Sequence, residues 1–473
     1  MSPFDKAQYD VLAKGLEIGE VMLKTAMSHD SFRLEAEFYT TSRNSFKSVS
    51  GEKAIVFSQY GTSDELNEQG KGYPVLRLNE FDSAFIGHPA KYCELSSREF
   101  AELQLKDGDV LICRTNGNPK LVGKSAIVPV DSQYAFASYL FRVRPNLGII
   151  NSETLVAYLN CQVGRREIER FAMRGNQANF SPAKFKQIQI PILGKKINAA
   201  VQSLTRSAFT ANEQSKEWYR NAEYQLLSRL NVANWAPNVE TISVKNFSDF
   251  ITAGRFDAEY FCPEYDDIFH KINAYQGGTI AASDVLVAGL VNEPIETPER
   301  YVELADIGLN GEITGCISAV FGSLPSRARQ RIKTGQVIVS SVEGSLDKCA
   351  LVTGEYNNAL CSTGFHRFHS NAINPETLLL LFKSWPIRQL MKRGCSGTIL
   401  SAISPGELSH VPLPLVDAET QQELAAKVQS SFGFRAKSKR LLDLAKRVVE
   451  VAIEQGEEKA VCLVTNSQGI DGQ

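Results

Sequence analysis

The sequence predicts an α+β fold in which two pseudo-repeated domains are separated and followed by long helices. Three observations support this prediction. Similar segments recur in the same order in both halves of the chain, each half mixes short apolar strands with helical periodicity, and each half closes on a long stretch with the spacing of a helix seam. A chain of 473 residues also exceeds what one hydrophobic core usually organises.

The internal repeat is clearest in two short acidic and aromatic segments. Residues 33–39 (RLEAEFY) resemble residues 255–261 (RFDAEYF). Further similar pairs follow in the same order: 73–87 with 300–315, 105–118 with 332–345, and 174–192 with 393–415. A gene duplication of an ordinary α/β domain would give the same pattern, so the repeat by itself indicates no particular function.

Each half contains both strand and helix signals. Short β-branched runs bounded by turn residues predict strands. They cover residues 109–114, 125–130, 336–341 and 350–354. Apolar residues at helical spacing predict a helix over 152–173, which begins with Ser152 and Glu153, and a second over 374–393 that Pro386 interrupts. Each half is therefore a mixed domain.

Two long helices are predicted after these domains. No glycine or proline occurs between Gly194 and Pro237, and no proline follows Pro414. Residues spaced alternately by four and three positions form a seam for a partner helix, as in a coiled coil. Gly433 is expected to kink or weaken the second helix, and Arg435 interrupts its seam. The seam positions are Ile197, Val201, Leu204, Ala208, Ala211, Ser215, Trp218 and Ala222, then Leu424, Val428, Ser431, Ser438, Leu442, Ala445, Val449 and Ala452.

These signals divide the chain into five parts. Residues 1–27 have helical spacing but no repeat mate, and their role stays open. The C-terminal residues are expected to form a loose tail. The predicted parts are a first domain with its N-terminal helix (1–194), a spacer helix (195–236), a second domain (237–417), a second long helix (418–459) and the tail (460–473).

Composition places the chain among ordinary globular proteins. Apolar residues make up 43% and charged residues 22%, and no apolar run has the length of a membrane span. Asp5, Glu17 and Glu20 argue against a signal peptide, and nine scattered cysteines without a CxxC pair favour reduced thiols in a cytoplasm. The net charge of −2 does not indicate a nucleic-acid binder, although the distribution of charge matters more than its sum.

The repeated motifs resemble those of the specificity subunits of Type I restriction-modification enzymes. An opening of the "RLDAEYY" type resembles residues 255–261 closely and 33–39 less closely. A strand-turn-strand of the form "GDVL…R…G…VGK" resembles residues 108–124, and a closing "RG…S…L…IPIP" resembles both 174–192 and 393–415. Each string is common by itself. Their shared order, found twice over about residues 28–455, makes the resemblance specific.

The resemblance implies an architecture and a set of partners. Each half would be a target recognition domain that reads one half of a bipartite site in double-stranded DNA. The long helices would pack as an antiparallel coiled coil whose length fixes the gap between the half-sites, as the rigid dimensions of dimeric readers do. Two methyltransferase subunits would dock on the helices, and motor-nuclease subunits would complete the enzyme. The chain itself would be a cytoplasmic recognition subunit without catalytic residues, cofactor or metal.

Candidate DNA-contacting residues in the first half lie in two segments. Arginine and asparagine bond bidentately to guanine and adenine edges, and lysines hold phosphates. The alternatives are a solvated hairpin for the first segment and a helix C-cap for the second. The candidates are Arg114, Thr115, Asn116, Lys120 and Lys124, then Arg174, Asn176, Gln177 and Asn179.

The second half offers different side chains at the matching places. Residues 341–345 lack the arginine, so this loop would read DNA differently, for example through Glu343 and a cytosine amine. A basic run of Arg327, Arg329, Arg331 and Lys333 suits phosphates or is a solvated charge run. A similar choice between DNA, a partner and solvent holds for the basic residues of 435–447. The segment that follows the helix predicted over 374–393 contributes three more candidates, Arg393, Ser396 and Thr398.

Catalytic motifs are absent from the sequence in recognisable form. The string at 117–125 lacks the GxxxxGK[ST] spacing of a phosphate loop and leads into a strand. His366 and His369 lie in a predicted strand, where an i, i+3 pair points to opposite faces, so a metal site with Cys361 is not expected. Two alternatives stay open: a nuclease or methyltransferase with diverged motifs, and a duplicated protein-interaction module.

Overall fold

The computed structural model describes residues 21–27, 46–172, 178–240, 242–290 and 298–468. The chain forms two compact units. Unit 1 comprises residues 1–211 and 436–473, and unit 2 comprises residues 212–435. The division falls inside both long helices, so each unit contains part of each helix. Residues 33–39, the first copy of the repeated opening, lie outside the described residues.

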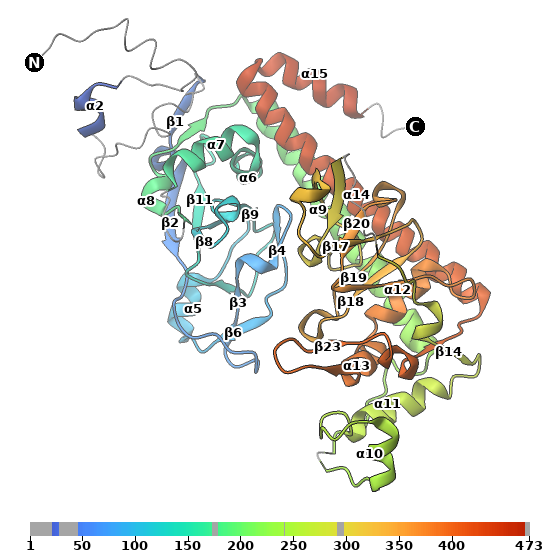
Figure 1. The fold of residues 1–473 in the computed structure, drawn as a ribbon. Helices are drawn as coiled ribbons and strands as arrows, with labels where there is room; N and C mark the ends of the chain where they lie inside the picture. The colour runs from blue at the N-terminus through green and yellow to red at the C-terminus, as the bar shows by residue number, and fades with distance from the viewer. Residues whose placement is uncertain (1–20, 28–45, 173–177, 241, 291–297, 469–473) are drawn as a thin grey trace, which may run out of the picture. The chain divides into compact units, whose positions relative to one another are not determined.

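Unit 1 is built on a mixed sheet of six strands in the order β2-β11-β7-β9-β5-β4. The central strand β7 is buried along its whole length, in keeping with its continuous apolar sequence. Figure 1 shows α6 and α7 beside this sheet. The strands are β1 (Ser48–Ser50), β2 (Ile55–Tyr60), β3 (Tyr73–Leu76), β4 (Phe81–Asp82), β5 (Phe85–Ile86), β6 (Lys91–Cys93), β7 (Val110–Cys113), β8 (Thr115–Asn116), β9 (Ser125–Ile127), β10 (Ala135–Phe136), β11 (Leu140–Pro145), β12 (Ala178–Asn179) and β13 (Gln189–Pro191). The helices before the long one are α2 (Leu23–Met27), α4 (Gly51–Ala54), α5 (Ser97–Leu103), α6 (Ser152–Asn160), α7 (Gln162–Phe171) and α8 (Pro182–Phe185).

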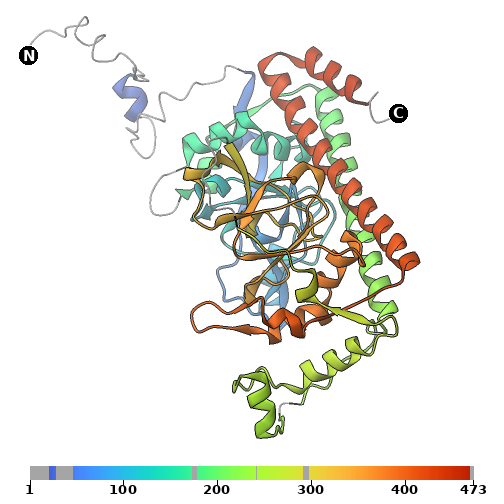
Figure 2. The same ribbon diagram turned by 45° about the vertical axis from the view of Figure 1, so that its right-hand side comes forward.

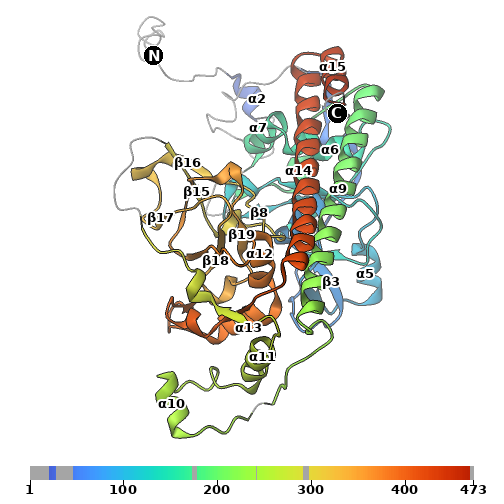
Figure 3. The ribbon, with the colours of Figure 1, turned by 90° about the vertical axis from the view of Figure 1, so that its right-hand side faces the viewer.

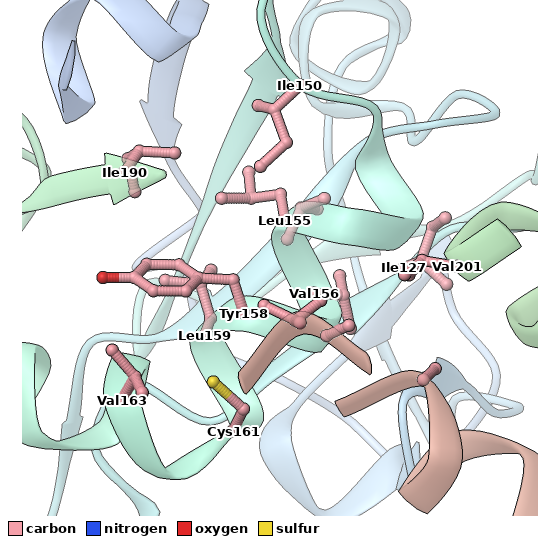
Figure 4. Packing of buried hydrophobic residues seen from close by; sticks show 14 of the residues in the cluster. Ile127, Ile150, Leu155, Val156, Tyr158, Leu159, Cys161, Val163, Ile190 and Val201 are labelled. Carbon is pink, nitrogen blue, oxygen red and sulfur yellow. The ribbon is translucent and has the colours of Figure 1, made fainter. Parts of the chain in front are cut away.

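The predicted helix over 152–173 is in fact two helices that meet at Cys161. The Cys161 backbone is extended, which ends α6 and starts α7. Gly164 allows the sharp turn, because a Cβ there would lie 1.9 Å from the carbonyl oxygen of Tyr158. Side chains from α6, such as Leu155 and Tyr158, fill the core around the break (Figure 4).

Unit 2 has a similar succession of elements. Strand β18 pairs with both β19 and β21 in one small sheet, and β15, β16, β17 and β20 form another. The strands are β14 (Thr279–Ala281), β15 (Pro298–Val302), β16 (Ile317–Val320), β17 (Ala328–Arg331), β18 (Val337–Ser340), β19 (Cys349–Leu351), β20 (Leu360–Ser362), β21 (Phe365–Phe368), β22 (Cys395–Ser396), β23 (Ala402–Ile403) and β24 (Pro412–Pro414). The helices are α10 (Phe247–Ala253), α11 (Pro263–Asn273), α12 (Pro375–Lys383) and α13 (Trp385–Arg393).

The break in the predicted helix over 374–393 lies at Ser384 and not at Pro386. The Ser384 backbone is extended and ends α12. Pro386 then occupies the first turn of α13. A proline is tolerated there because the first N–H groups of a helix have no intrahelical acceptor. The proline therefore starts the second helix and does not interrupt the first.

The long helices are α9 (Lys195–Arg229) and α14 (Ala418–Glu454), and α15 (Glu457–Gln468) follows the second. Figures 1 and 3 show α9 and α14 side by side. In unit 1, the chain just before α9 meets the start of α15, just after α14: the Gly194 N–H donates to a Glu457 carboxylate oxygen (2.6 Å). In unit 2, the end of α9 meets the start of α14, where Arg229 Nε donates to the Thr420 hydroxyl (3.0 Å). The two helices thus run in opposite directions within each unit.

The predicted seam of α14 is buried at all eight positions, and that of α9 at seven of eight. The exception is Trp218, which is 38% exposed, while Tyr219 is buried in its place. A helix has 3.6 residues per turn, so its buried stripe drifts relative to a strict 3.5-residue spacing. After Ser215 the buried positions continue as Tyr219, Ala222 and Leu226.

One further expectation about these helices is corrected, and one stays a prediction. Helix α14 runs through Gly433 without a break, and the expected kink or weakening at this glycine stays a prediction. The C-terminal residues are not a loose tail up to Gln468, because they form α15. Ala460 of α15 is fully buried, and Val461 packs on the core of unit 1. Most of the helix predicted over 1–27 lies outside the described residues, which contain only α2 of it.

The same hydrogen bonds recur in both units at matching places. Asn151 caps α6 and donates to the backbone carbonyl of Asn198 in α9 (3.1 Å). Asn374 caps α12 and donates to the backbone carbonyl of Gln421 in α14 (2.8 Å). Each pair ties the helix that covers a unit's strands to the long helix that follows that unit's domain.

A buried arginine on one strand of each unit repeats in the same way. Arg142 of β11 is buried and donates to the Gln104 carbonyl (2.7 Å). Arg367 of β21 is also buried and donates to the Arg331 carbonyl (2.6 Å). These hydrogen bonds offset part of the cost of burying each guanidinium group, so each arginine links its strand to an earlier segment of the chain.

Candidate nucleic-acid interface

Two of the predicted DNA-contacting segments of unit 1 lie side by side. After β7 the chain passes through Arg114 into β8, which pairs antiparallel with β12. Thr115 lies opposite Asn179 in this ladder. The Phe180 N–H donates to the Arg114 carbonyl (2.8 Å) and closes the arrangement at its base. Residues far apart in the sequence therefore form one paired surface, called here the unit 1 loop pair (114–120 with 178–180).

The tip of the unit 1 loop pair is held by its own side chains. Asn116 accepts a hydrogen bond from the Asn118 N–H (2.8 Å), and Asn118 accepts one from the Lys120 N–H (3.0 Å). These Asx turns fix the backbone through the side-chain oxygens and leave the amide nitrogens as donors. Gly117 has open space around it, and residues 117–120 are exposed. The tip is therefore rigid and accessible.

Arg114 stands at the base of this loop. Its guanidinium lies over the Tyr60 ring, 5.3 Å from the centroid. The buried Nε of Arg114 makes no hydrogen bond among the described residues. Stacking on an aromatic ring orients a guanidinium without using its donors. The arrangement can present the terminal nitrogens of Arg114 to an external acceptor.

The two candidate lysines differ. Lys120 is exposed at the tip. Lys124 is half-buried beneath the loop, and its desolvation lowers the pKa of its ammonium group. An external phosphate can reach Lys120 more easily than Lys124. Three candidates, Arg174, Asn176 and Gln177, lie outside the described residues.

Unit 2 contains the same backbone arrangement with other side chains. The Ile403 N–H donates to the Ser341 carbonyl (2.8 Å), as Phe180 does to Arg114. Val342 pairs with Ala402. The Glu343 N–H donates to the Ser401 carbonyl (3.0 Å). This surface is called the unit 2 loop pair (341–345 with 395–403).

The candidates of unit 2 after α13 fall into two groups. The Arg393 side chain is engaged inside the unit, where it donates to Asp266 (2.8 Å) and to the Tyr260 carbonyl (3.1 Å). Ser396 and Thr398 are exposed on the hairpin formed by β22 and β23. Of these three candidates, Ser396 and Thr398 are therefore the ones that an external ligand can reach.

The basic run of unit 2 lies along β17. Arg327 donates to Glu303 (3.3 Å), and Arg331 donates to Glu299 (3.1 Å). Arg329 is exposed between them and makes no ion pair within the described ranges. Among the arginines of this run, Arg329 is thus the one whose charge is not offset by an ion pair within the described residues, and the exposed Lys333 shares this property.

Glu343 keeps an available carboxylate. Its closest ion-pair partner in the described part of the chain is Lys392, at 3.9 Å. The exposed ammonium of Lys392 also lies 3.4 Å from a Glu259 oxygen. An ion pair this long at the surface contributes little to stability, so the Glu343 carboxylate can still accept a shorter hydrogen bond from a ligand.

The described residues offer no arrangement typical of a metal-binding or phosphate-binding site. No group of three or more histidine, cysteine, aspartate and glutamate side chains there is placed to hold a metal ion. His366 is half-buried, its Nε2 lies 2.9 Å from the Ile403 carbonyl, and burial lowers its pKa. Lys124 is followed by strand β9 and not by a helix, so no helix N-terminus faces the loop. No helix among the described residues has the length and apolar character that crossing a membrane requires.

Sequence reasoning missed two features of this surface. Tyr60, which positions Arg114, comes from β2 and carries no local signal. Ile399 and Leu400, exposed between β22 and β23, were not singled out. A sequence signal existed for the second: nine residues separate Arg393 from Ile403, whereas five separate Arg174 from Phe180.

A comparison with curated proteins supports the resemblance that the motifs suggested. Over 79 residues the chain is 32% identical to the specificity subunit of the Type I restriction enzyme EcoKI from Escherichia coli strain K12. The resemblance to Type I specificity subunits is confirmed. The match spans 16% of this chain and 17% of that relative. No protein-family model matches the sequence.

Solved structures of Type I systems are also similar to the chain, at low identity. The S subunit from M. genitalium is 12% identical, with a TM-score of 0.37, over 87% of this chain and 96% of its own. The HsdS subunit from Thermoanaerobacter tengcongensis is 14% identical, with a TM-score of 0.29, over 87% and 97%. A chain from a study of complex assembly and conformational transition of the type I R-M system gives 14% identity and a TM-score of 0.29, over 87% and 98%.

Proposed function

We propose that this chain is the DNA-sequence-recognition subunit of a Type I restriction-modification complex. Each unit would contain one target recognition domain that reads one half of a bipartite site in double-stranded DNA. The chain would direct partner enzymes to that site and would have no catalytic site, cofactor or metal of its own. The 32% identity over 79 residues to the EcoKI specificity subunit supports this assignment.

One observation carries the proposal: a shared backbone framework holds different side chains in the two units. The Phe180-to-Arg114 and Ile403-to-Ser341 hydrogen bonds occupy matching positions, each 2.8 Å long. A donor-rich tip around Asn116 in unit 1 is replaced by a tip around Glu343 in unit 2. Because arginine and asparagine favour purine edges and glutamate accepts from the cytosine amine, the two loops suit different base pairs. An asymmetric, bipartite DNA site requires this combination of equal scaffolds and unequal contacts.

The long helices would set the distance between the half-sites. A pair of antiparallel helices is stiff along its length, and half-site spacing in dimeric DNA readers follows the rigid dimensions of the protein. Inside unit 2, the buried Ser215 and Ser431 hydroxyls lie 3.1 Å apart and fix the register of α9 against α14. We therefore interpret the pair as a coiled-coil spacer between the predicted domains 1–194 and 237–417.

Partner subunits would dock on the chain and supply the chemistry. Two methyltransferase subunits on the helices, with motor-nuclease subunits added to them, would form the complete enzyme. Trp218 and Tyr224 are large exposed residues of α9 that would suit such a contact. Aromatic residues of this kind are enriched at protein interfaces.

The decisive experiment maps methylated adenines across the source genome with this gene intact and deleted. Loss of one bipartite motif, two short blocks around a fixed gap, is the expected result. An unchanged methylome in cells that express the whole complex would contradict the proposal. It would favour the duplicated interaction module, and methyl transfer or cleavage by the isolated chain would favour a diverged enzyme.

A loop exchange refines this experiment. Replacing residues 341–345 of unit 2 with the sequence of 114–118 keeps the framework bonds and changes the contacts. One block of the methylated motif should change while the other block and the gap stay the same. A change in both blocks, or in the gap alone, would contradict separate readout by the two units.

A further inference from the structure

The two loop pairs differ by a short insertion in unit 2. Ile403 and Phe180 hold matching places, because each donates its N–H to the residue that follows a central strand. The chain before Ile403 is four residues longer than the chain before Phe180, counted from Arg393 and Arg174 (nine against five). The extra residues form the hairpin β22–β23, which projects from the rest of unit 2 (Figures 1 and 2).

The tip of this hairpin is apolar and exposed. Ile399 is 99% exposed and Leu400 is 64% exposed. They lie between Gly397, whose φ of +131° only glycine adopts easily, and Ser401. Two adjacent aliphatic side chains are rarely this exposed unless they meet a partner, although single exposed apolar residues need no explanation.

The base of the hairpin is held from three sides. An Arg255 guanidinium nitrogen donates to the Cys395 carbonyl (2.9 Å). The Glu343 N–H donates to the Ser401 carbonyl (3.0 Å), and the His366 ring lies 2.9 Å from the Ile403 carbonyl. The tip therefore projects from a fixed base beside residues 341–345. A preordered contact loses little conformational entropy on binding.

The chemistry of the hairpin indicates which groove it would enter. A two-stranded ribbon fits the major groove of B-DNA, where each thymine presents its C5 methyl group to apolar side chains. Proteins that bind the minor groove read it with arginine, lysine, asparagine or glutamine, and residues 394–404 contain none of these. The neighbouring carboxylate of Glu343 suits a cytosine amine in the major groove and not the negative potential of the minor groove.

We propose that Ile399 and Leu400 read thymine methyl groups in the major groove of the half-site that unit 2 recognises. This inference rests on the proposed function and adds a specificity element that unit 1 lacks at the matching place. Glu343 and the hairpin would then read neighbouring base pairs by different means, the first by a hydrogen bond and the second by apolar contact.

The test uses the chain assembled with its methyltransferase partner and the DNA site found by the methylome map. Each thymine of the unit 2 half-site is replaced in turn by deoxyuridine, which lacks only the methyl group. At one or two positions affinity should fall about three- to fivefold, the factor that burial of one methyl group gives. The double variant Ile399→Ala with Leu400→Ala should bind both DNAs equally.

A matched control separates this effect from a general loss of apolar surface. Leu309 is 70% exposed elsewhere in unit 2, so Leu309→Ala should keep the discrimination between thymine and uracil. Equal binding of both DNAs by the unaltered complex, or a unit 2 block without thymine on either strand, would overturn the inference. So would an Ile399→Ala, Leu400→Ala double variant that assembles normally and still discriminates thymine from uracil, since another part of the complex would then read the methyl group. In all these cases sequence-selective binding persists, whereas its absence would instead contradict the proposed function.

Discussion

Arg393 both donates a hydrogen bond to the Tyr260 carbonyl (3.1 Å) and covers the ring of Tyr260, 4.6 Å from the centroid. Arg255 lies at the same distance from this ring and donates to Cys395. The repeated opening motif at 255–261 and the closing motif that begins at Arg393 are therefore in contact. Both motifs serve to build the base on which the hairpin of unit 2 stands.

Replacing Arg393 should cost stability, because its bonds to Asp266 and Tyr260 lie inside the unit. We expect Arg393→Ala to lower the stability of unit 2 by roughly 1.5–3 kcal/mol, the usual range for hydrogen bonds of a charged group. Hydrogen exchange of the amides of α11 and α13 measures this locally. Lys392→Ala is the control, since its surface pairs should contribute less than about 1 kcal/mol. Equal protection in both variants would show that the Arg393 contacts are dispensable.

Base recognition by unit 1 should depend on Arg114 and Asn116. Each variant, Arg114→Ala or Asn116→Ala, should cost about 1–3 kcal/mol of binding to the specific site and relax selectivity at one position of one half-site. Competition binding against DNAs altered at single positions measures this. Ser345→Ala, in the half-buried loop of unit 2, should leave the block read by unit 1 unaffected. Uniform weakening across all sequences would instead assign both residues to the phosphate backbone.

Phosphate contact by unit 2 should involve Arg329 more than its neighbours. Arg327 and Arg331 already pair with Glu303 and Glu299, whereas Arg329 makes no ion pair among the described residues. Arg329→Ala should weaken binding to all sequences alike and reduce the slope of log affinity against log salt by about 1. An unchanged salt slope would place Arg329 on a solvated face.

The hairpin should loosen at acidic pH because of His366. Burial lowers the pKa of His366 from its usual 6.5, while the unfolded chain keeps the usual value. The unfolded state then binds more protons, so stability is complete above pH 6.5 and declines as the pH falls below it. The protection factor of the Ile403 amide, which corrects for the intrinsic slowing of exchange in acid, should fall as the pH is lowered from 7.5 to 5.5. The variant His366→Gln should remove this dependence; a variant that retains it would exclude His366 as the cause.

Gly433 offers a stabilising substitution. It lies exposed inside α14, and an added Cβ would meet no atom within 4 Å. Alanine restricts the unfolded chain more than glycine does, so Gly433→Ala should raise the free energy of unfolding by about 0.5–1 kcal/mol. Thermal unfolding checks the sign. A lower midpoint would mean that α14 needs the flexibility of glycine at this point.

Periodic features of the sequence determined much of the fold. Strands β7 and β18 follow from continuous β-branched runs, and α9 and α14 from long stretches without helix breakers. The seam of α14 was predicted completely because burial against a partner helix demands an apolar or small residue at each turn. These features depend on neighbours along the chain, so the sequence displays them directly.

Sequence patterns misplaced the helix ends and buried positions that depend on contacts between residues distant in the chain. The break at Cys161 requires Gly164 to pass the Tyr158 carbonyl, and α15 forms because Ala460 reaches the core of unit 1. Trp218 and Tyr219 both fit the sequence pattern, and only the direction of the buried stripe distinguishes them.

For the candidate interface too, the sequence predicted some properties and the tertiary structure decided others. The sequence by itself identified the paired motifs and the polar residues around Asn116 and Thr398, because repetition and residue chemistry are visible without coordinates. Tertiary structure decided that Arg393 faces inward and Ile399 outward, and that residues 341–345 lie beside the hairpin. Side-chain direction depends on the packing of segments distant in sequence, which spacing along the chain does not encode.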